Sequence, residues 1–235
     1  MLPIGVWIDN ACVLIGGLIG ASCRDRIPQR IKEPLTVIFG VAAIGIGITS
    51  FIRLHSLPAV LLALISGALI GELLNLDLRI KNVLSRLIRH LKFPIEGDHD
   101  SYMQFYLLVA VTLCASGANI FGALNEGMTG DSTVLISKAV MDIFAAAIFA
   151  SRLGYAMILI VIPQCLILTS LFYLANFIMP VVSATMILDF ISVGGLLTFV
   201  VGISIAGIKH ISAANLLPAL ILVFPVSALF TLLMG

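Results

Sequence analysis

Charged residues are scarce in this chain of 235 residues. Lysine and arginine number 13 and aspartate and glutamate number 12, so 11% of the chain is charged, whereas roughly a quarter of a soluble domain is. Hydrophobic residues make up 60% of the chain, and its mean hydropathy is +1.17. This composition excludes an ordinary soluble domain and predicts an all-α integral membrane protein. The basic residues gather in short loops, which argues against a nucleic-acid partner.

Sequence motifs of common enzymes are also missing. The four cysteines lie far apart with no CxxC spacing, and the four histidines form no HxxxH or HExxH pattern. No Gly-x-Ser-x-Gly elbow or phosphate-binding loop occurs. We therefore expect no enzymatic activity, no metal and no cofactor. The cysteines are expected to pack as small apolar residues.

Long uncharged runs separate the charged clusters and predict transmembrane helices. A run of about twenty apolar residues crosses the roughly 30 Å of hydrocarbon in a bilayer. Eight runs have about this length, and they cover residues 4–22, 34–52, 57–76, 102–124, 132–150, 155–179, 181–208 and 213–233. The fifth contains Lys138 and Asp142, so it is either a full span or a re-entrant hairpin. The sequence therefore predicts a polytopic helical bundle of about eight transmembrane helices, or seven.

Basic residues in the short loops predict the orientation in the membrane, because cytoplasmic loops are enriched in lysine and arginine. One basic group follows the first run at 24–32, and another occupies 79–92. Both loops are predicted to be cytoplasmic, with the N-terminus outside. Eight spans would also place the C-terminus outside. Arg53 is the one exception on the outer side.

The segment 77–93 has a different pattern. Basic residues fill the gaps of an apolar stripe at helical spacing, formed by Ile80, Val83, Leu84, Leu87, Ile88 and Leu91. This pattern predicts one amphipathic helix in the cytoplasmic interface, with membrane lipid as its partner. Binding of a protein partner is the alternative interpretation.

A weak internal similarity links the two ends of the chain. Aligning Gly40 with Gly195 brings 47–49 onto 202–204 and places Asn10 near Gln164. Chance can supply such matches in glycine-rich spans, but copies of opposite orientation are typical of the inverted repeats of secondary transporters. The single membrane domain (1–235) then divides into a first three-helix repeat (1–76), the amphipathic helix and its loop (77–100), central helices (101–153) and a second three-helix repeat (154–235).

Lys138 and Asp142 are the most informative residues, because they interrupt an apolar run. Residues four apart share one helix face, so the ammonium and carboxylate can pair, and either charge alone would be costly in hydrocarbon. We expect a substrate-binding or ion-binding site that draws on the polar residues inside the bundle; its candidates are Asn10, Asn119, Asp131, Ser137, Lys138, Asp142 and Gln164. For the amides and hydroxyls, hydrogen bonding between helices is the alternative role.

Helix-weakening residues are concentrated between Ala115 and Gly127. Within a membrane, irregular backbone is tolerated where it is buried in protein or lines a cavity. The stretch therefore predicts either an unwound helix end that faces a cavity or a simple turn outside the membrane.

The stretch 122–142, with its Gly130-Asp131 and its Lys138-x-x-x-Asp142, resembles the YqgA-like bacterial inner-membrane family, a family of unknown function. Asn10 followed by 15–20 (IGGLIG) and 215–219 (NLLPA) belong to the same resemblance, which extends over essentially the whole chain. The length and opening residues resemble those of the enterobacterial member. The resemblance implies a polytopic protein of the bacterial plasma membrane and leaves its activity open.

Two functional hypotheses follow. In the first, the chain is a secondary transporter of a small solute or ion, and Lys138 and Asp142 form a titratable pair within its binding site. In the second, it is a structural or regulatory membrane scaffold in which the same pair only fastens the helices together. Glycine-rich helix faces would serve packing within one chain or in a homo-oligomer equally well.

Overall fold

Helices make up nearly all of the computed structural model, which describes residues 2–26, 28–90, 98–178, 180 and 182–234. No strand occurs within these ranges. The helices, with η for 3-10 helices, are α1 (Ile4–Ser22), η1 (Arg24–Arg26), α2 (Gln29–Phe51), α3 (Leu57–Leu73), α4 (Leu76–His90), α5 (His99–Cys114), α6 (Gly117–Thr129), α7 (Thr133–Leu153), η2 (Gly154–Ile160), α8 (Val161–Ile178), α9 (Ala184–Ile205), η4 (Ala213–Leu216) and α10 (Pro218–Met234). The predicted all-α bundle is confirmed.

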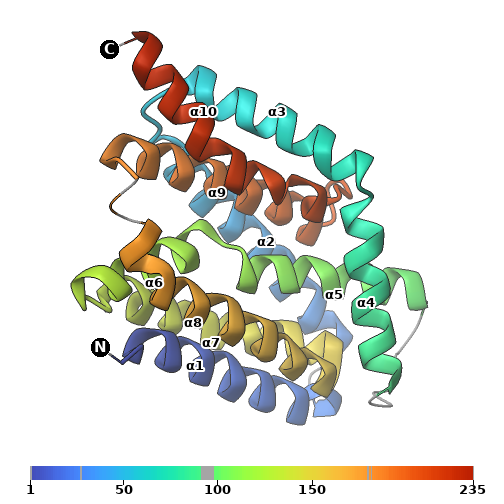
Figure 1. Ribbon diagram of the computed structural model, residues 1–235. Coiled ribbons are helices and arrows are strands. Elements are labelled where there is room, and N and C mark those ends of the chain that lie inside the picture. The colour runs from blue at the N-terminus through green and yellow to red at the C-terminus, as the bar shows by residue number, and fades with distance from the viewer. Residues whose placement is uncertain (1, 27, 91–97, 179, 181, 235) are drawn as a thin grey trace.

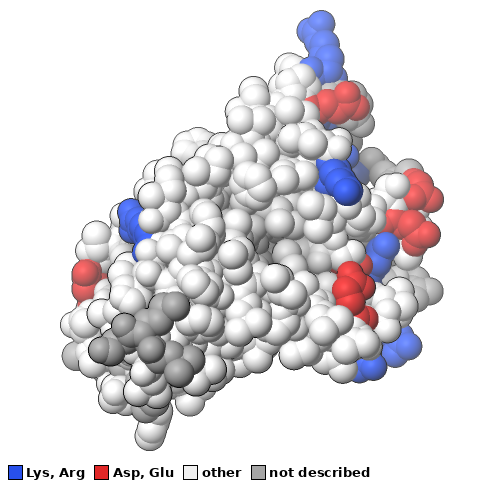
Figure 2. All heavy atoms as spheres, turned by 90° about the horizontal axis from the view of Figure 1, so that it is seen from above, with Lys and Arg blue, Asp and Glu red and all other residues white. Residues whose placement is uncertain are grey.

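The lengths and surfaces of these helices are those of a multi-pass membrane protein. Six helical stretches are long and apolar enough to cross a membrane, and a seventh is added if α3 and α4, bent by 56°, count as one span. Large apolar side chains face outward, for example Ile65, Phe144 and Phe177 at 68%, 68% and 77% exposure, as expected where lipid replaces water. Figure 2 shows the visible charged side chains gathered at the two ends of the helices, with an uncharged band between.

The helices form two groups with α5 between them (Figure 1). In one group α1 packs mainly on α7 and α6 on α8; in the other α2 packs on α9 and α3 on α10. Both chain termini lie at one end of the bundle, which we call the termini end, and α4 lies at the other, which we call the α4 end. The chain reverses at Gly154, whose φ is +64°, so α8 runs antiparallel to α7.

Glycines allow the two closest helix pairs to approach each other. Gly16 and Gly20 of α1 lie against the main chain of α7, at Ile143 and Ala147. On α2, Gly47 lies against Gly195 of α9, and Gly40 lies against Gly202. Small residues at such crossings bring helix backbones into contact, which favours association where no hydrophobic force acts between helices in lipid.

Replacing Gly20 with alanine should destabilise the protein. The added Cβ would collide with the Ala147 carbonyl of α7, and overpacking of this kind costs about 1–3 kcal/mol. Thermal unfolding of the purified protein measures the effect. Gly45→Ala is the matched control, because nothing lies within 4 Å of the Cβ position there; equal melting temperatures for the two variants would contradict the tight α1–α7 contact.

Two buried carboxylates hold helix N-termini at the termini end. Glu126 of α6, 2% exposed, accepts hydrogen bonds from the Gly5 and Val6 amides at 2.6 and 3.2 Å. Asp189 of α9, fully buried, accepts from the amides of His55 and Ser56, both at 2.8 Å. The first amides of a helix have no partner within the helix, so each carboxylate from a distant segment supplies one and complements the helix dipole.

The structure changes some of the predicted spans. The fifth run is the continuous helix α7, whose 21 residues extend about 31 Å at 1.5 Å per residue, and not a hairpin. The fourth run is interrupted at Ala115 and Ser116 and continues as α6 to Thr129. The second begins earlier than expected, at Gln29, because Pro34 is accommodated inside α2.

The predicted amphipathic helix corresponds to α4, within the described residues up to His90. Part of its apolar stripe faces the protein: Ile88 is fully buried, and Ile80 and Leu84 pack against the same core. Val83 is 63% exposed. Residues 91–97, which complete the predicted helix and begin its loop, lie outside the described residues.

Candidate functional site

Lys138 and Asp142 form an ion pair on α7, which confirms the contact that their spacing predicts. The Lys138 ammonium donates to both oxygens of the Asp142 carboxylate at 2.6 Å. The side chains are only 16% and 6% exposed. A short charge-assisted contact of this kind offsets part of the cost of burying the two charges.

A second carboxyl group lies beside this pair. Asp9 of α1 is fully buried, and its Oδ2 accepts a hydrogen bond from Nε2 of Gln164, on α8, at 2.8 Å. Asp9 interacts electrostatically with Asp142 and Lys138. The contact across α1 and α7 depends on the close approach that Gly16 and Gly20 permit.

We call Asp9, Lys138, Asp142 and Gln164 the polar cluster. It contains two carboxyl groups and one ammonium, so full ionisation leaves one negative charge, and one bound proton makes the cluster neutral. Asp9 Oδ1 and Gln164 Oε1 are buried with no hydrogen-bond partner among the described residues. The cluster therefore has unused acceptor positions inside the bundle.

One side of the polar cluster faces a cavity of about 370 Å³ between α2, α5, α6, α7 and α9. Lys138 and Asp142 line it, and so does Arg53 at the termini end of α2. Ser116, at the break between α5 and α6, lines the same cavity, as does Thr112 of α5. The helix interruption thus borders a cavity, which agrees with the first of the two interpretations of this glycine-rich stretch. The volume suits a small solute.

Three phenylalanines pack toward the α4 end from this cavity. Phe149 of α7, fully buried, makes edge-to-face contacts with Phe39 and Phe105, with ring centroids 4.7 and 5.9 Å apart. Phe39 lines the cavity, whereas Phe105 lines a different cavity at the α4 end. This aromatic trio therefore lies between the two cavities.

Comparison with known proteins gives the family. The family model described as "Protein of unknown function (DUF554)" matches residues 4–228. The chain belongs to this family. It is 43% identical over 233 residues to a protein described as "Uncharacterized protein YqgA" from Escherichia coli K12, covering 98% of each chain. It is 25% identical over 223 residues to "Uncharacterized membrane protein YdfK" from Bacillus subtilis 168, covering 93% of each. No solved structure matches.

In this DUF554 protein the two predicted asparagines lie outside the polar cluster's hydrogen bonds. Asn10, 6% exposed, donates to the Val6 carbonyl at 2.7 Å within α1. Asn119 donates to the Leu113 carbonyl at 2.6 Å and so bridges the break between α5 and α6. The Oδ1 atoms of both are buried and unpartnered among the described residues.

The other predicted residues divide between the cavity and the surface. Ser137 lines the cavity and donates to the Thr133 carbonyl at 2.7 Å. Asp131 is exposed in the turn before α7, away from the cluster. The Thr133 amide and hydroxyl donate to its carboxylate at 2.9 and 2.5 Å, which lowers the pKa of that carboxyl. Asp131 thus forms a local Asx turn immediately before α7.

Sequence reasoning did not include Asp9, Glu126 and Asp189 among the site candidates, although all three carboxyl groups are buried. A signal was present for Asp9, since an acidic residue in an apolar run is as unusual as the Lys138–Asp142 pair. The role of Glu126 as a helix cap depends on a contact 121 residues away, which no local spacing indicates. Among the described residues, no group of three His, Cys, Asp or Glu side chains could hold a metal ion.

Proposed function

We propose that this DUF554 protein is a secondary transporter of a small solute or ion, and that the polar cluster is its binding and coupling site. The observation that carries the proposal is the ion pair of Lys138 and Asp142 at the wall of a cavity inside an apolar bundle, with the buried Asp9 beside it. Ionisable groups at membrane depth face ion pathways, proton relays or substrate sites in most membrane proteins.

The charge balance of the polar cluster suits coupling. A cation that binds at Asp142 competes with the Lys138 ammonium and neutralises the one negative charge of the ionised cluster. A bound proton neutralises the same charge when the cation is absent. Exchange of partners inside the cluster would then link occupancy of the cavity to the proton content of the site. In this proposal the protein moves its substrate without changing it chemically, so no residue has a catalytic role.

The aromatic trio supplies the closed side of the proposed pathway. The cavity reaches from the polar cluster to Arg53 at the termini end, and Phe39, Phe149 and Phe105 pack below it toward the α4 end. A transporter open to one side needs such a constriction on the other, and hydrophobic constrictions exclude water and ions.

The packing of α2 on α9 supports the inverted repeat. The alignment pairs Gly40 with Gly195 and Gly47 with Gly202, and in the structure Gly40 contacts Gly202 while Gly47 contacts Gly195. Contacts exchanged in this way are expected where two copies meet across a two-fold axis. Transporters with inverted repeats bind substrate where the repeats meet, and here Asp9 and Gln164 join α1 of the first repeat to α8 of the second.

The same proposal includes a topology of eight crossings in the bacterial inner membrane with a periplasmic N-terminus. α5 with α6 forms one broken crossing, and the reversal at Gly154 separates α7 from α8. Basic side chains such as Arg79, Arg86 and Lys209 belong to the α4 end, which the positive-inside rule places in the cytoplasm. There α4 would meet the lipid headgroups with its exposed residues.

A scaffold is the second candidate function, and one observation favours it. Lys138 and Asp142 satisfy each other, and Asp9 ties α1 to α8 through Gln164. Such contacts would serve equally in a membrane protein whose polar cluster only fixes the helix arrangement.

Water accessibility of the cavity distinguishes the two. In a protein without Cys12, Cys23, Cys114 and Cys165, single cysteines at Ser137 and Met141 should react with a membrane-impermeant thiol reagent added on the termini side, because both positions line the cavity. Ala145→Cys, on the same helix but at 1% exposure, should stay protected. Thr129→Cys is the exposed control. Protection of both cavity positions, with Thr129→Cys labelled, would reject the carrier.

A further inference from the structure

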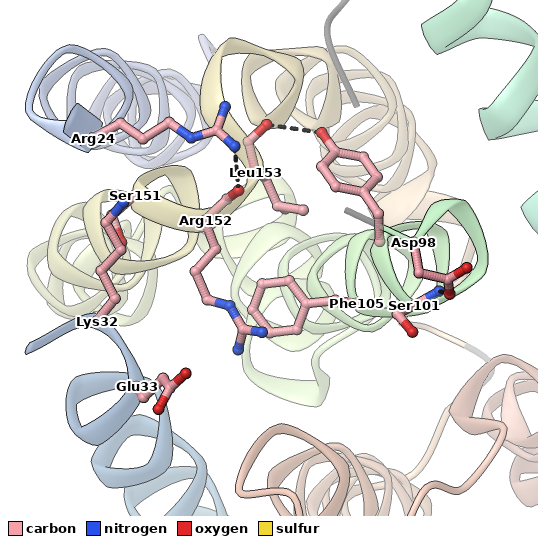
Figure 3. A pocket seen from close by; sticks show the side chains of 10 residues that line it. Arg24, Lys32, Glu33, Asp98, Ser101, Phe105, Ser151, Arg152 and Leu153 are labelled. Carbon is pink, nitrogen blue, oxygen red and sulfur yellow. Dashed lines mark hydrogen bonds between the residues drawn. The ribbon is translucent and has the colours of Figure 1, made fainter. Parts of the chain in front are cut away.

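A second cavity of about 380 Å³ lies at the α4 end, beyond the aromatic trio (Figure 3). Its lining comes from η1, from the first turns of α2 and α5, and from the last turn of α7. We call it the basic vestibule, after its three cations Arg24, Lys32 and Arg152. It is separate from the polar cluster, none of whose residues lines it.

Lys32 is the unusual member of the basic vestibule. Its side chain is only 8% exposed and lines the cavity, and in Figure 3 it extends toward Ser151 at the end of α7. No hydrogen bond or ion pair joins its ammonium to any described residue. A buried ammonium without a partner is costly, and most of that cost disappears when an anion binds beside it.

The acidic residues of the basic vestibule are engaged elsewhere. Asp98 accepts a hydrogen bond from the Ser101 amide at 2.8 Å and so caps α5. Glu33 interacts electrostatically with Arg152, whose guanidinium lies 4.4 Å from the centre of the Phe105 ring. Three cations against two carboxylates leave a formal charge of 3 − 2 = +1 in the lining, and Lys32 is the cation that neither acid engages.

Ser151 and Arg24 line the basic vestibule together with Lys32. The Ser151 side chain lies on the same wall in Figure 3, from the last turn of α7. Arg24 enters from η1 and is oriented by a hydrogen bond from its guanidinium to the Arg152 carbonyl at 3.1 Å. The Ser151 hydroxyl already donates to the Ile148 carbonyl at 2.7 Å. The Arg24 guanidinium and the Lys32 ammonium, from different helices, therefore supply the donors for phosphate oxygens.

We propose that the basic vestibule binds a phosphate group, with Lys32 as its principal charge partner and Arg24 as its second. The phosphate could come from the headgroup of an anionic phospholipid, since basic pockets between transmembrane helices bind such headgroups, or from a free phosphate in the adjoining aqueous phase. Phosphate binding in the basic vestibule requires neither the polar cluster nor transport, so its test is independent of the proposed carrier role.

Binding to the full-length purified protein tests the proposal in two arms. In the first, the protein is held in phosphatidylcholine nanodiscs and binding of radiolabelled inorganic phosphate is measured by equilibrium dialysis. In the second, native mass spectrometry compares retention of phosphatidylglycerol and phosphatidylcholine. We expect saturable binding in at least one arm. Phosphate binding alone identifies a soluble ligand, and selective retention of phosphatidylglycerol identifies a lipid.

Variants at Lys32 decide whether the basic vestibule is the site. Lys32→Met should raise the dissociation constant, or reduce lipid retention, by about tenfold, as expected for the loss of one charge-assisted contact. Lys209→Met, an exposed lysine outside this cavity, should bind as the wild type does. Lys32→Gln serves if the methionine variant does not fold. Absence of saturable binding in both arms, or unchanged binding in the Lys32 variants, overturns the proposal.

Discussion

Lys138→Met should lower the free energy of unfolding by about 3 kcal/mol, near the lower end of the cost of breaking a buried ion pair. The substitution leaves the Asp142 and Asp9 carboxyl groups close together with no cation between them. The lower end applies because Lys138 lies at a cavity wall and is 16% exposed. Denaturant unfolding of the detergent-purified protein, followed by tryptophan fluorescence at Trp7, measures the change.

The double variant Lys138→Met with Asp142→Leu separates the two functional hypotheses. Apolar residues can replace a whole buried ion pair with little loss of stability, so most of the lost stability should return. If the protein is a carrier, the double variant should still fail to move solutes into proteoliposomes. If it is a scaffold, the double variant should behave as the wild type does. Asp131→Asn is the control, because that carboxyl group lies outside the cavity. A single Lys138→Met variant as stable as the wild type would contradict the buried ion pair.

Phe149→Ala should cost about 3–5 kcal/mol, because it removes a fully buried aromatic ring from a packed core. The ring also fills the space between Phe39 and Phe105. Its loss should open a route between the cavity that Lys138 and Asp142 line and the basic vestibule. We therefore expect a fall in melting temperature together with passive leakage of ions through proteoliposomes.

Phe144→Ala on the same helix is the matched comparison for Phe149→Ala. Phe144 is 68% exposed on the lipid-facing surface, so its truncation should change stability by much less and leave the vesicles tight. Phe149→Leu keeps most of the side-chain volume, so it should recover most of the lost stability. It lacks the aromatic ring, so the proteoliposomes should still leak ions. Tight vesicles with Phe149→Ala, under conditions where the protein remains folded, would show that the aromatic trio does not close the pathway.

Local patterns predicted much of this molecule. The apolar runs indicated the helices, because hydrocarbon-length segments are a property of consecutive residues. The four-residue spacing of Lys138 and Asp142 predicted their contact for the same reason. Boundaries were less certain, as at Ala115 and Ser116, where hydropathy continues across a break in the helix.

The remaining features depend on contacts between distant residues. Asp9 joins the polar cluster only because α1, α7 and α8 meet, and its hydrogen bond to Gln164 connects residues 155 apart in the chain. No local spacing encodes that neighbour. Lys32 was assigned to a basic loop, and only the packing of η1, α2 and α7 shows that it is buried. Residue type thus indicated which groups were unusual, whereas their partners required the fold.

The buried carboxylate caps at the termini end restrict the order in which a ribosome-bound chain can mature. The first helix receives its acceptor from a residue 120 positions later, and the third from one more than 130 positions later. At roughly 5–20 residues per second, synthesis must continue for several seconds before either helix end is satisfied. Early spans must therefore wait in the insertion machinery or in lipid with exposed amide groups. A nascent chain that ends before Asp189 should be a much better substrate for membrane proteases than the finished protein.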